Sequence, residues 1–175
     1  RLLAGRVRRG LLASIAGVVA FGLGDAWYHS EEIGPLALVK ATQLAIAVGG
    51  LLTIDAQTSR RRARAIGVLV VAAIYATTTA AGIFRHDGTS TILLLLAGVL
   101  TSAILLPWGA VAQLASVLAA LTAAVATVVW TPDAATILVG QRAFALAVVF
   151  AGSIVIAHEH ARQRQLRLAV ERIHF

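Results

Sequence analysis

The chain has 175 residues, of which 59% are hydrophobic and only 13% are charged, and its formal net charge is +7. A soluble domain carries about 25% charged residues, and one water-soluble core of this size could not bury so much apolar side chain, so the composition indicates a membrane protein. The basic residues lie in three short clusters between long apolar runs, which argues against nucleic acid as a partner. The chain contains no cysteine, which excludes disulfides and thiolate metal sites.

The basic opening RLLAGRVRRG is typical of a signal peptide, but the apolar stretch after it ends in GDAWYHSEE without a small-residue cleavage site, so we expect a retained helix. A membrane crossing needs about 20 mainly apolar residues. Six stretches come close to this length: Leu11–Tyr28, Leu36–Ile54, Ala65–Phe84, Thr91–Leu106, Ala110–Trp130 and Ile137–Ala157. The expected fold class is an all-α integral membrane protein, a six-transmembrane-helix bundle with short loops.

Two connections between these stretches are informative. Pro107-Trp108-Gly109 predicts a tight turn that places the fourth and fifth spans side by side and antiparallel. The segment Pro132–Arg142 fits a short loop, a surface helix or the start of a longer, tilted sixth span, and these alternatives stay open.

Orientation follows from the three basic clusters, because arginine and lysine favour the cytoplasmic side. The clusters lie at the N-terminus, in the loop QTSRRRAR after the second span, and in the tail after the sixth. They share one side only if the number of crossings is even. We therefore expect a multi-pass protein of the cell (inner) membrane with both termini in the cytoplasm. The tryptophans at 27, 108 and 130 fall at predicted span ends, where interfacial anchors are expected.

The chain after the sixth span reads HEHARQRQLRLAVERIHF, which predicts an amphipathic exit helix over 158–175 behind a membrane domain over 1–157. Leu166, Val170 and Ile173 form one seam of a heptad pattern, so two copies could begin a parallel coiled coil and the chain could be a homodimer. A basic amphipathic helix lying on anionic lipid is the alternative interpretation.

Six spans, very short outer loops, an inner turn within LLPWGAVAQLASVLAAL and a charged exit helix together resemble a known module. The module is the six-helix membrane sensor or anchor at the N-terminus of bacterial signalling enzymes: histidine kinases, diguanylate cyclases and class III adenylyl cyclases. The resemblance is architectural and covers nearly the whole chain; its one motif-like segment is P-W-G-x-x-x-Q, from Pro107 to Gln113. It implies that the last helix passes a membrane signal to a dimeric catalytic domain. No catalytic motif occurs in these 175 residues, so any cyclase or kinase activity is expected beyond Phe175.

Imidazoles and carboxylates converge at the predicted outer rim, where they could bind a divalent cation or respond to pH. The candidate ligands are His29, Glu31, Glu32, His86 and Asp87. The alternative is that short outer loops are polar because they touch water and headgroups. No other cofactor is evident, and a small molecule, a lipid or an ion all stay open as ligands.

Polar residues within the spans suggest helix contacts. Lys40 could extend outward to the interface, or pair with Asp25 or Glu32. Gln43 and the run Thr77-Thr78-Thr79 predict hydrogen bonds between helices rather than a pocket.

Three functions compete. The first is a sensory or regulatory membrane domain acting through its exit helix. The second is a small transporter or channel, with Asp25, Lys40 and Gln43 along a pathway. The third is a membrane enzyme or an accessory subunit of a larger complex. An enzyme is disfavoured because hydrolase and zinc-protease motifs do not occur.

Overall fold

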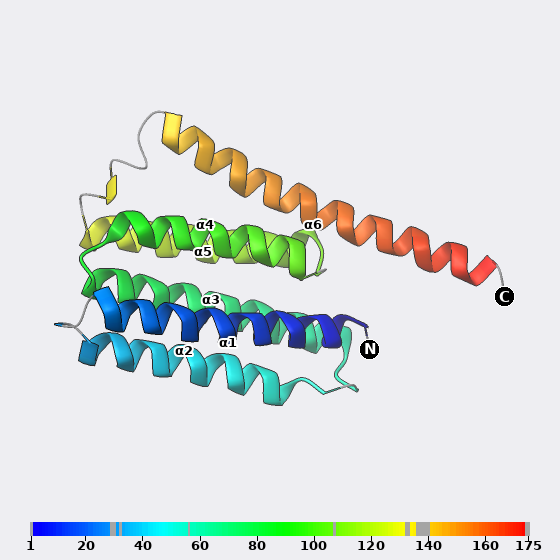
Figure 1. Cartoon of the computed structure of the whole chain (residues 1–175). Helices are drawn as coiled ribbons and strands as arrows, with labels where there is room; N and C mark the ends of the chain where they lie inside the picture. Colours follow the sequence, from blue (N-terminus) through cyan, green and yellow to red (C-terminus); the bar gives the residue numbers. More distant parts are fainter. Residues whose placement is uncertain are drawn as a thin grey trace.

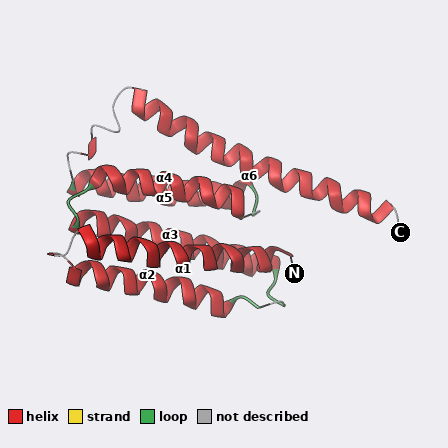
Figure 2. Ribbon diagram, viewed as in Figure 1, coloured by secondary structure: helices red, strands yellow, loops and turns green. Residues whose placement is uncertain are grey.

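The computed structural model describes residues 2–28, 31, 33–55, 57–106, 108–131, 134–135 and 141–173. Within these ranges the chain forms helices joined by short connections (Figure 2). The helices are α1 (Leu2–Tyr28), α2 (Ile33–Thr53), α3 (Arg60–Phe84), α4 (Gly88–Leu105), α5 (Ala110–Trp130) and α6 (Gln141–Ile173).

Five helices, α1 to α5, are long and apolar enough to cross a membrane, which supports the prediction of a helical membrane protein. The observed α5 has the same bounds as the predicted fifth span, and α2 and α4 lie within three residues of theirs. The predicted sixth span begins in residues outside the described part of the chain, so a sixth crossing stays a prediction. Helix α6 is continuous through residue 157, where the membrane domain was expected to end, and reaches Ile173.

The first five helices lie side by side along a common axis, and α3 is the central one (Figure 1). It packs against α1 and α2 on one side and against α4 and α5 on the other, while α6 packs on α4 and α5 and then extends past the bundle. The start of α1 and the end of α6 lie at the same end of the bundle. We call this the arginine-rich end, because α3 also starts there with three arginines, and we call the other the Asp87 end.

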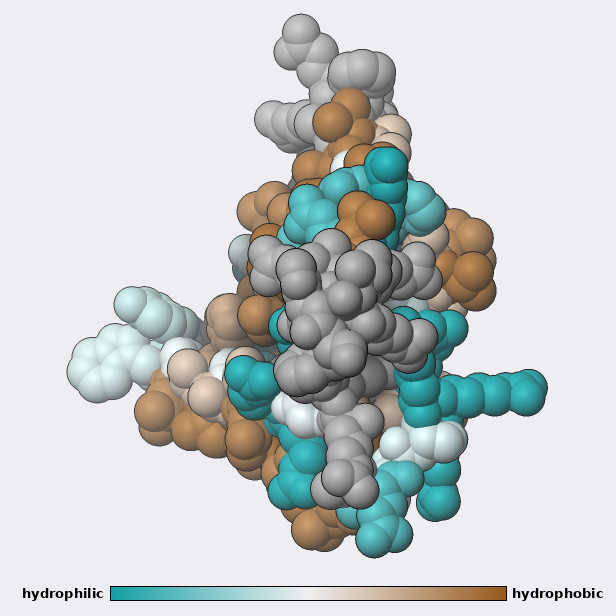
Figure 3. All heavy atoms as spheres, turned by 90° about the vertical axis from the view of Figure 1, so that its right-hand side faces the viewer, coloured by the Kyte–Doolittle hydropathy of each residue, from teal (hydrophilic) through white to brown (hydrophobic). Residues whose placement is uncertain are grey.

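Large apolar side chains cover the circumference of the bundle. Leu23, Leu52 and Val111 are each more than 70% exposed, and many other leucines and valines are exposed by a smaller fraction. Figure 3 views the molecule from the arginine-rich end, where polar side chains project among the apolar side chains that cover the flanks of the bundle. Such an exterior is unfavourable in water and is expected where lipid is the solvent.

Short turns set the register between neighbouring helices. Ser59 caps the start of α3 by accepting a hydrogen bond from the backbone N–H of Arg62, as N-cap serines do. Helices α3 and α4 approach so closely that a Cβ on Gly82 would overlap the side chain of Thr91. Gly109, with φ of 87°, supplies the left-handed backbone that starts α5.

Candidate functional site: a buried triad beside an apolar groove

The five candidate metal ligands do not all fall in the described chain. His29 and Glu32 lie outside the described residues, and Glu31, between α1 and α2 in the chain, is exposed. Among the residues that the structure describes, no group of three or more metal-binding side chains comes together. The predicted cation site therefore stays a prediction.

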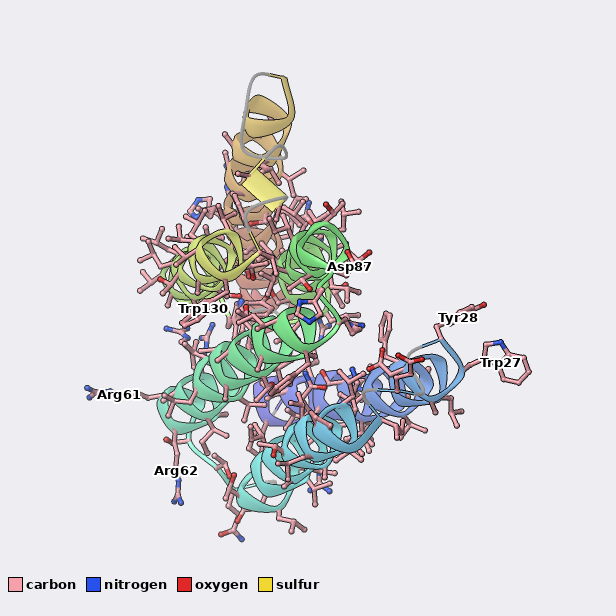
Figure 4. The ribbon with its side chains drawn as sticks, turned by 90° about the vertical axis from the view of Figure 1, so that its left-hand side faces the viewer. Trp27, Tyr28, Arg61, Arg62, Asp87 and Trp130 are labelled. Carbon is pink, nitrogen blue, oxygen red and sulfur yellow. The ribbon has the colours of Figure 1, made fainter. Side chains whose placement is uncertain are left out.

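His86 and Asp87 have clear roles in the turn between α3 and α4. His86 takes a left-handed backbone conformation, φ 52°. The N–H of His86 donates to the carbonyl of Ile83, and the N–H of Asp87 donates to the carbonyl of Gly82, both at 3.1 Å. These are the hydrogen bonds of a Schellman helix ending. The carboxylate of Asp87 then caps α4 by accepting from the N–H of Ser90 at 2.9 Å. Figure 4 looks along the bundle from this end and shows Asp87 at the start of α4, apart from Tyr28 at the end of α1.

The same turn positions Arg85, the C-cap residue of α3, toward the carboxylate of Asp25 on α1. Nη1 of Arg85 lies 3.0 Å from Oδ1 of Asp25, and Nζ of Lys40 on α2 lies 3.2 Å from Oδ2. The three side chains are only 7%, 6% and 14% exposed for Arg85, Asp25 and Lys40. One buried carboxylate thus joins three helices through two cations, and we call this set the triad.

Lys40 has further support from its neighbours. Its ammonium lies 5.8 Å from the centre of the Phe21 ring, a cation–π distance, and its stem passes Gly22. Of the three alternatives that the sequence left open for Lys40, the pairing with Asp25 is the one observed. The role of Arg85 was missed, because Arg85 is 60 residues from Asp25 in the chain. A lone carboxylate near the end of an apolar helix was the available signal, since such a group requires a partner.

The triad stands at one end of an elongated cavity of about 320 Å³, which we call the α1–α4 groove. Helices α1, α3 and α4 form most of its walls, and α2 contributes Lys40 and Gln43. Toward the arginine-rich end its lining is mainly apolar and includes Val7, Leu11 and Leu106, with Thr101 and Ser102 as polar members. The groove therefore has a cationic end and an apolar body.

Hydrogen bonds between helices were predicted for Gln43 and the threonine run, and these are confirmed. Nε2 of Gln43 donates to the hydroxyl of Thr78 at 3.2 Å, which ties α2 to α3. The hydroxyl of Thr79 donates to the carbonyl of Ala123 on α5 at 3.2 Å. These polar groups stabilise the bundle, although Gln43 also lines the groove.

Gln113 lies at the centre of a second buried network, near the arginine-rich end. Its Oε1 accepts from Nε1 of Trp108 at 2.9 Å and from Ser102 at 3.3 Å. Its Nε2 donates to the carbonyl of Val99 at 3.0 Å and to Ser153 on α6 at 3.4 Å. The P-W-G-x-x-x-Q segment is thereby explained as packing: its tryptophan and glutamine bind each other across the turn.

The expectation that Trp108 is an interfacial anchor was wrong. Its side chain is 1% exposed, because the turn at Gly109 directs it inward onto Gly67 and Gln113. Trp27 and Trp130 are 82% and 69% exposed at the Asp87 end, as interfacial anchors require. Sequence position alone did not distinguish these cases.

Comparison of the chain with protein-family models, with curated proteins and with solved structures finds no match.

Proposed function

We propose that this chain is a membrane sensory or regulatory domain that anchors a dimeric cytoplasmic output and controls it through α6. Helix α6 supports this role by its length. Its 33 residues span about 50 Å at about 1.5 Å per residue, whereas the bilayer core is about 30 Å thick. The helix packs on α4 and α5 and then leaves the bundle at the arginine-rich end (Figure 1).

One observation carries the proposal: buried hydrogen bonds run from the wall of the groove to the exit helix. Ser102 of α4 lines the groove and donates to Gln113 of α5, which donates to Ser153 of α6. Tyr75 of α3 also lines the groove and shares a 3.3 Å hydrogen bond with Ser116. A change in the groove that moves α3 or α4 would therefore act on α6 through polar contacts with defined geometry.

The output end of the proposal depends on α6 pairing between two copies. The side chain of Leu166 is 57% exposed, so it is free to enter an interface, while those of Val170 and Ile173 lie outside the described set. In this scheme α6 is the sixth crossing, the arginine-rich end is cytoplasmic in the inner membrane, and a cyclase or kinase domain follows Phe175. The charge distribution supports that orientation.

A transporter is the second candidate, since Lys40 and Gln43 line the groove as that hypothesis predicts. The mainly apolar lining toward the arginine-rich end disfavours it, because a polar solute would lose most of its hydration there. An accessory subunit of a larger complex would use the same bundle without a signalling role for α6.

The test fuses the whole chain to the catalytic domain of a dimeric adenylyl cyclase as a reporter. Three further fusions carry an insert of three, four or seven residues after Ile173. Each residue turns a helix by about 100°, so a seven-residue insert nearly preserves the facing of the two α6 helices and a four-residue or three-residue insert changes it.

If α6 transmits a signal, cyclic AMP production should keep its level with seven inserted residues and change several-fold with three or four. Gln113→Leu, which cuts the hydrogen bonds to α6, should shift the level of the uninserted fusion. Equal output from all fusions would mean that the chain is a passive anchor and would contradict the sensory function.

A further inference from the structure

Arg85 carries two hydrogen-bond donors for which the described residues provide no acceptor. Its Nη1 is bound to Asp25, whereas Nε and Nη2 are buried and unpartnered. Burying charged N–H groups without acceptors is costly, so their presence calls for an explanation. Nε and Nη2 share one edge of the planar guanidinium, where two parallel N–H bonds match the two oxygens of a carboxylate.

The charge of the triad favours the same kind of ligand. Two cations, Lys40 and Arg85, face one carboxylate, Asp25, which leaves one positive charge within the set. Asp87 and Arg85 both line a second, more open hollow, and the carboxylate of Asp87 binds the first turn of α4. One additional carboxylate on Arg85 would neutralise the triad in a region that lipid surrounds.

The groove itself is suited to the rest of such a ligand. Arg85 and Lys40 line one end, and Leu11, Val70 and Leu106 line the part toward the arginine-rich end. Its volume of about 320 Å³ lies at the lower limit of small-molecule sites, which run from about 300 to 1,000 Å³. This space suits one hydrocarbon chain rather than the two chains of a phospholipid.

We propose that the α1–α4 groove binds a long-chain fatty acid from the surrounding bilayer, with its carboxylate on Arg85 and Lys40. The hydrocarbon chain then lies between α1 and α4 and points toward Leu106. This assigns a ligand class to the proposed sensory domain, and it rests on that function only for the consequence of binding. Binding itself is measured without any output domain.

The experiment uses the full chain in nanodiscs of zwitterionic lipid and measures saturable binding of radiolabelled palmitate. Arg85→Gln removes the charge and the donor edge but leaves Lys40 to pair with Asp25, so affinity should fall roughly tenfold or more. Arg85→Lys keeps the charge without the planar edge and should also weaken binding. Arg61→Gln removes one exposed arginine at the other end, seen in Figure 4, and should leave affinity unchanged.

A second pair of variants tests the chain-binding part without touching the triad. Gly17 lines the groove, and a Cβ built there meets nothing within 4 Å, so Gly17→Leu should fill the space and reduce affinity roughly tenfold. Gly49 on α2 has equally open surroundings but lies outside the groove lining, so Gly49→Leu is the matched control. Circular dichroism and size-exclusion profiles confirm folding of each variant.

Competition with methyl palmitate, which has the same chain and an uncharged head, completes the design. Saturable binding that Arg85→Gln and Gly17→Leu weaken, and that methyl palmitate does not displace, supports the proposal. Undetectable palmitate binding, equal affinity in Gly17→Leu, or equal displacement by the ester overturns it. The reporter fusions would still show helix-phase dependence in that case, so the two failures are distinguishable.

Discussion

Replacing Asp25 by leucine removes the carboxylate that both buried cations share. In the structure the carboxylate lies 3.0 Å from Arg85 and 3.2 Å from Lys40. Loss of one member of a buried ion pair typically costs about 3–5 kcal/mol, because a charge is left buried without a partner. The two ion pairs share one acceptor and do not add independently, so we expect Asp25→Leu to lower the free energy of unfolding by about 3–5 kcal/mol.

The assay is SDS-induced unfolding in mixed micelles, followed by far-ultraviolet circular dichroism. Glu159→Leu is the control, because Glu159 pairs with Arg162 at 3.9 Å on an exposed part of α6, where such pairs contribute about 0–1 kcal/mol. Adding Lys40→Met and Arg85→Met to Asp25→Leu should restore most of the lost stability, since an apolar replacement of the whole set leaves no orphan charge. A loss below about 1 kcal/mol for Asp25→Leu, or no recovery in the triple variant, would refute the triad as described.

Three further predictions concern other parts of the chain. Gln113→Leu leaves the indole N–H of Trp108 buried without its acceptor and should cost about 1–3 kcal/mol in the same titration, with a shifted tryptophan emission; an unchanged midpoint would contradict this. Ser59→Ala removes the cap of α3 and should cost about 0.5–2 kcal/mol, with faster amide exchange confined to the first turn of that helix; uniform exchange along α3 would not fit. The hydroxyl of Thr58, which donates to Asp55 at 2.7 Å, holds the pKa of Asp55 below its ordinary value, so this contact stabilises the loop above the carboxyl's ordinary pKa and is lost as pH falls through the lowered one; a carbon-13 titration should show the pKa of Asp55 rising in Thr58→Ala, and an unaltered midpoint would exclude this cause.

The spans were predictable because a membrane crossing requires about 20 consecutive, mainly apolar residues, and such runs can be read directly from the sequence. Ala110–Trp130 matches its helix residue for residue, since Gly109 and Pro132 mark its limits. Helices α1 and α3 begin before the predicted spans at Leu11 and Ala65, in segments that contain arginines. The backbone hydrogen bonds of a helix continue into such polar segments, so the hydropathy pattern did not predict where these helices begin.

The site was only partly predictable, because its geometry depends on contacts between distant residues. Asp25 was among the alternatives for Lys40, as the two lie at the same end of consecutive helices, but the sequence did not choose between Asp25, Glu32 and the interface. Arg85 contacts Asp25 because α3 ends at that point, where the turn at His86 reverses the chain. A contact between residues so far apart in the chain leaves no local sequence pattern from which it could be predicted. We predicted an interfacial position for Trp108 from the general preference of tryptophan for interfaces. The positive φ of the neighbouring Gly109 instead turns the chain so that Trp108 is buried.

The link between the groove and α6 can be measured directly, since the chain contains no native cysteine to interfere with labelling. Spin labels at Arg61→Cys and Leu166→Cys, both exposed positions, report the distance between the start of α3 and the end of α6. Labelled chains diluted with unlabelled ones in nanodiscs restrict the signal to single copies. We expect palmitate to shift this distance distribution and Gln113→Leu to abolish the shift. An identical distribution with and without palmitate, under conditions where palmitate is bound, would contradict the proposed coupling.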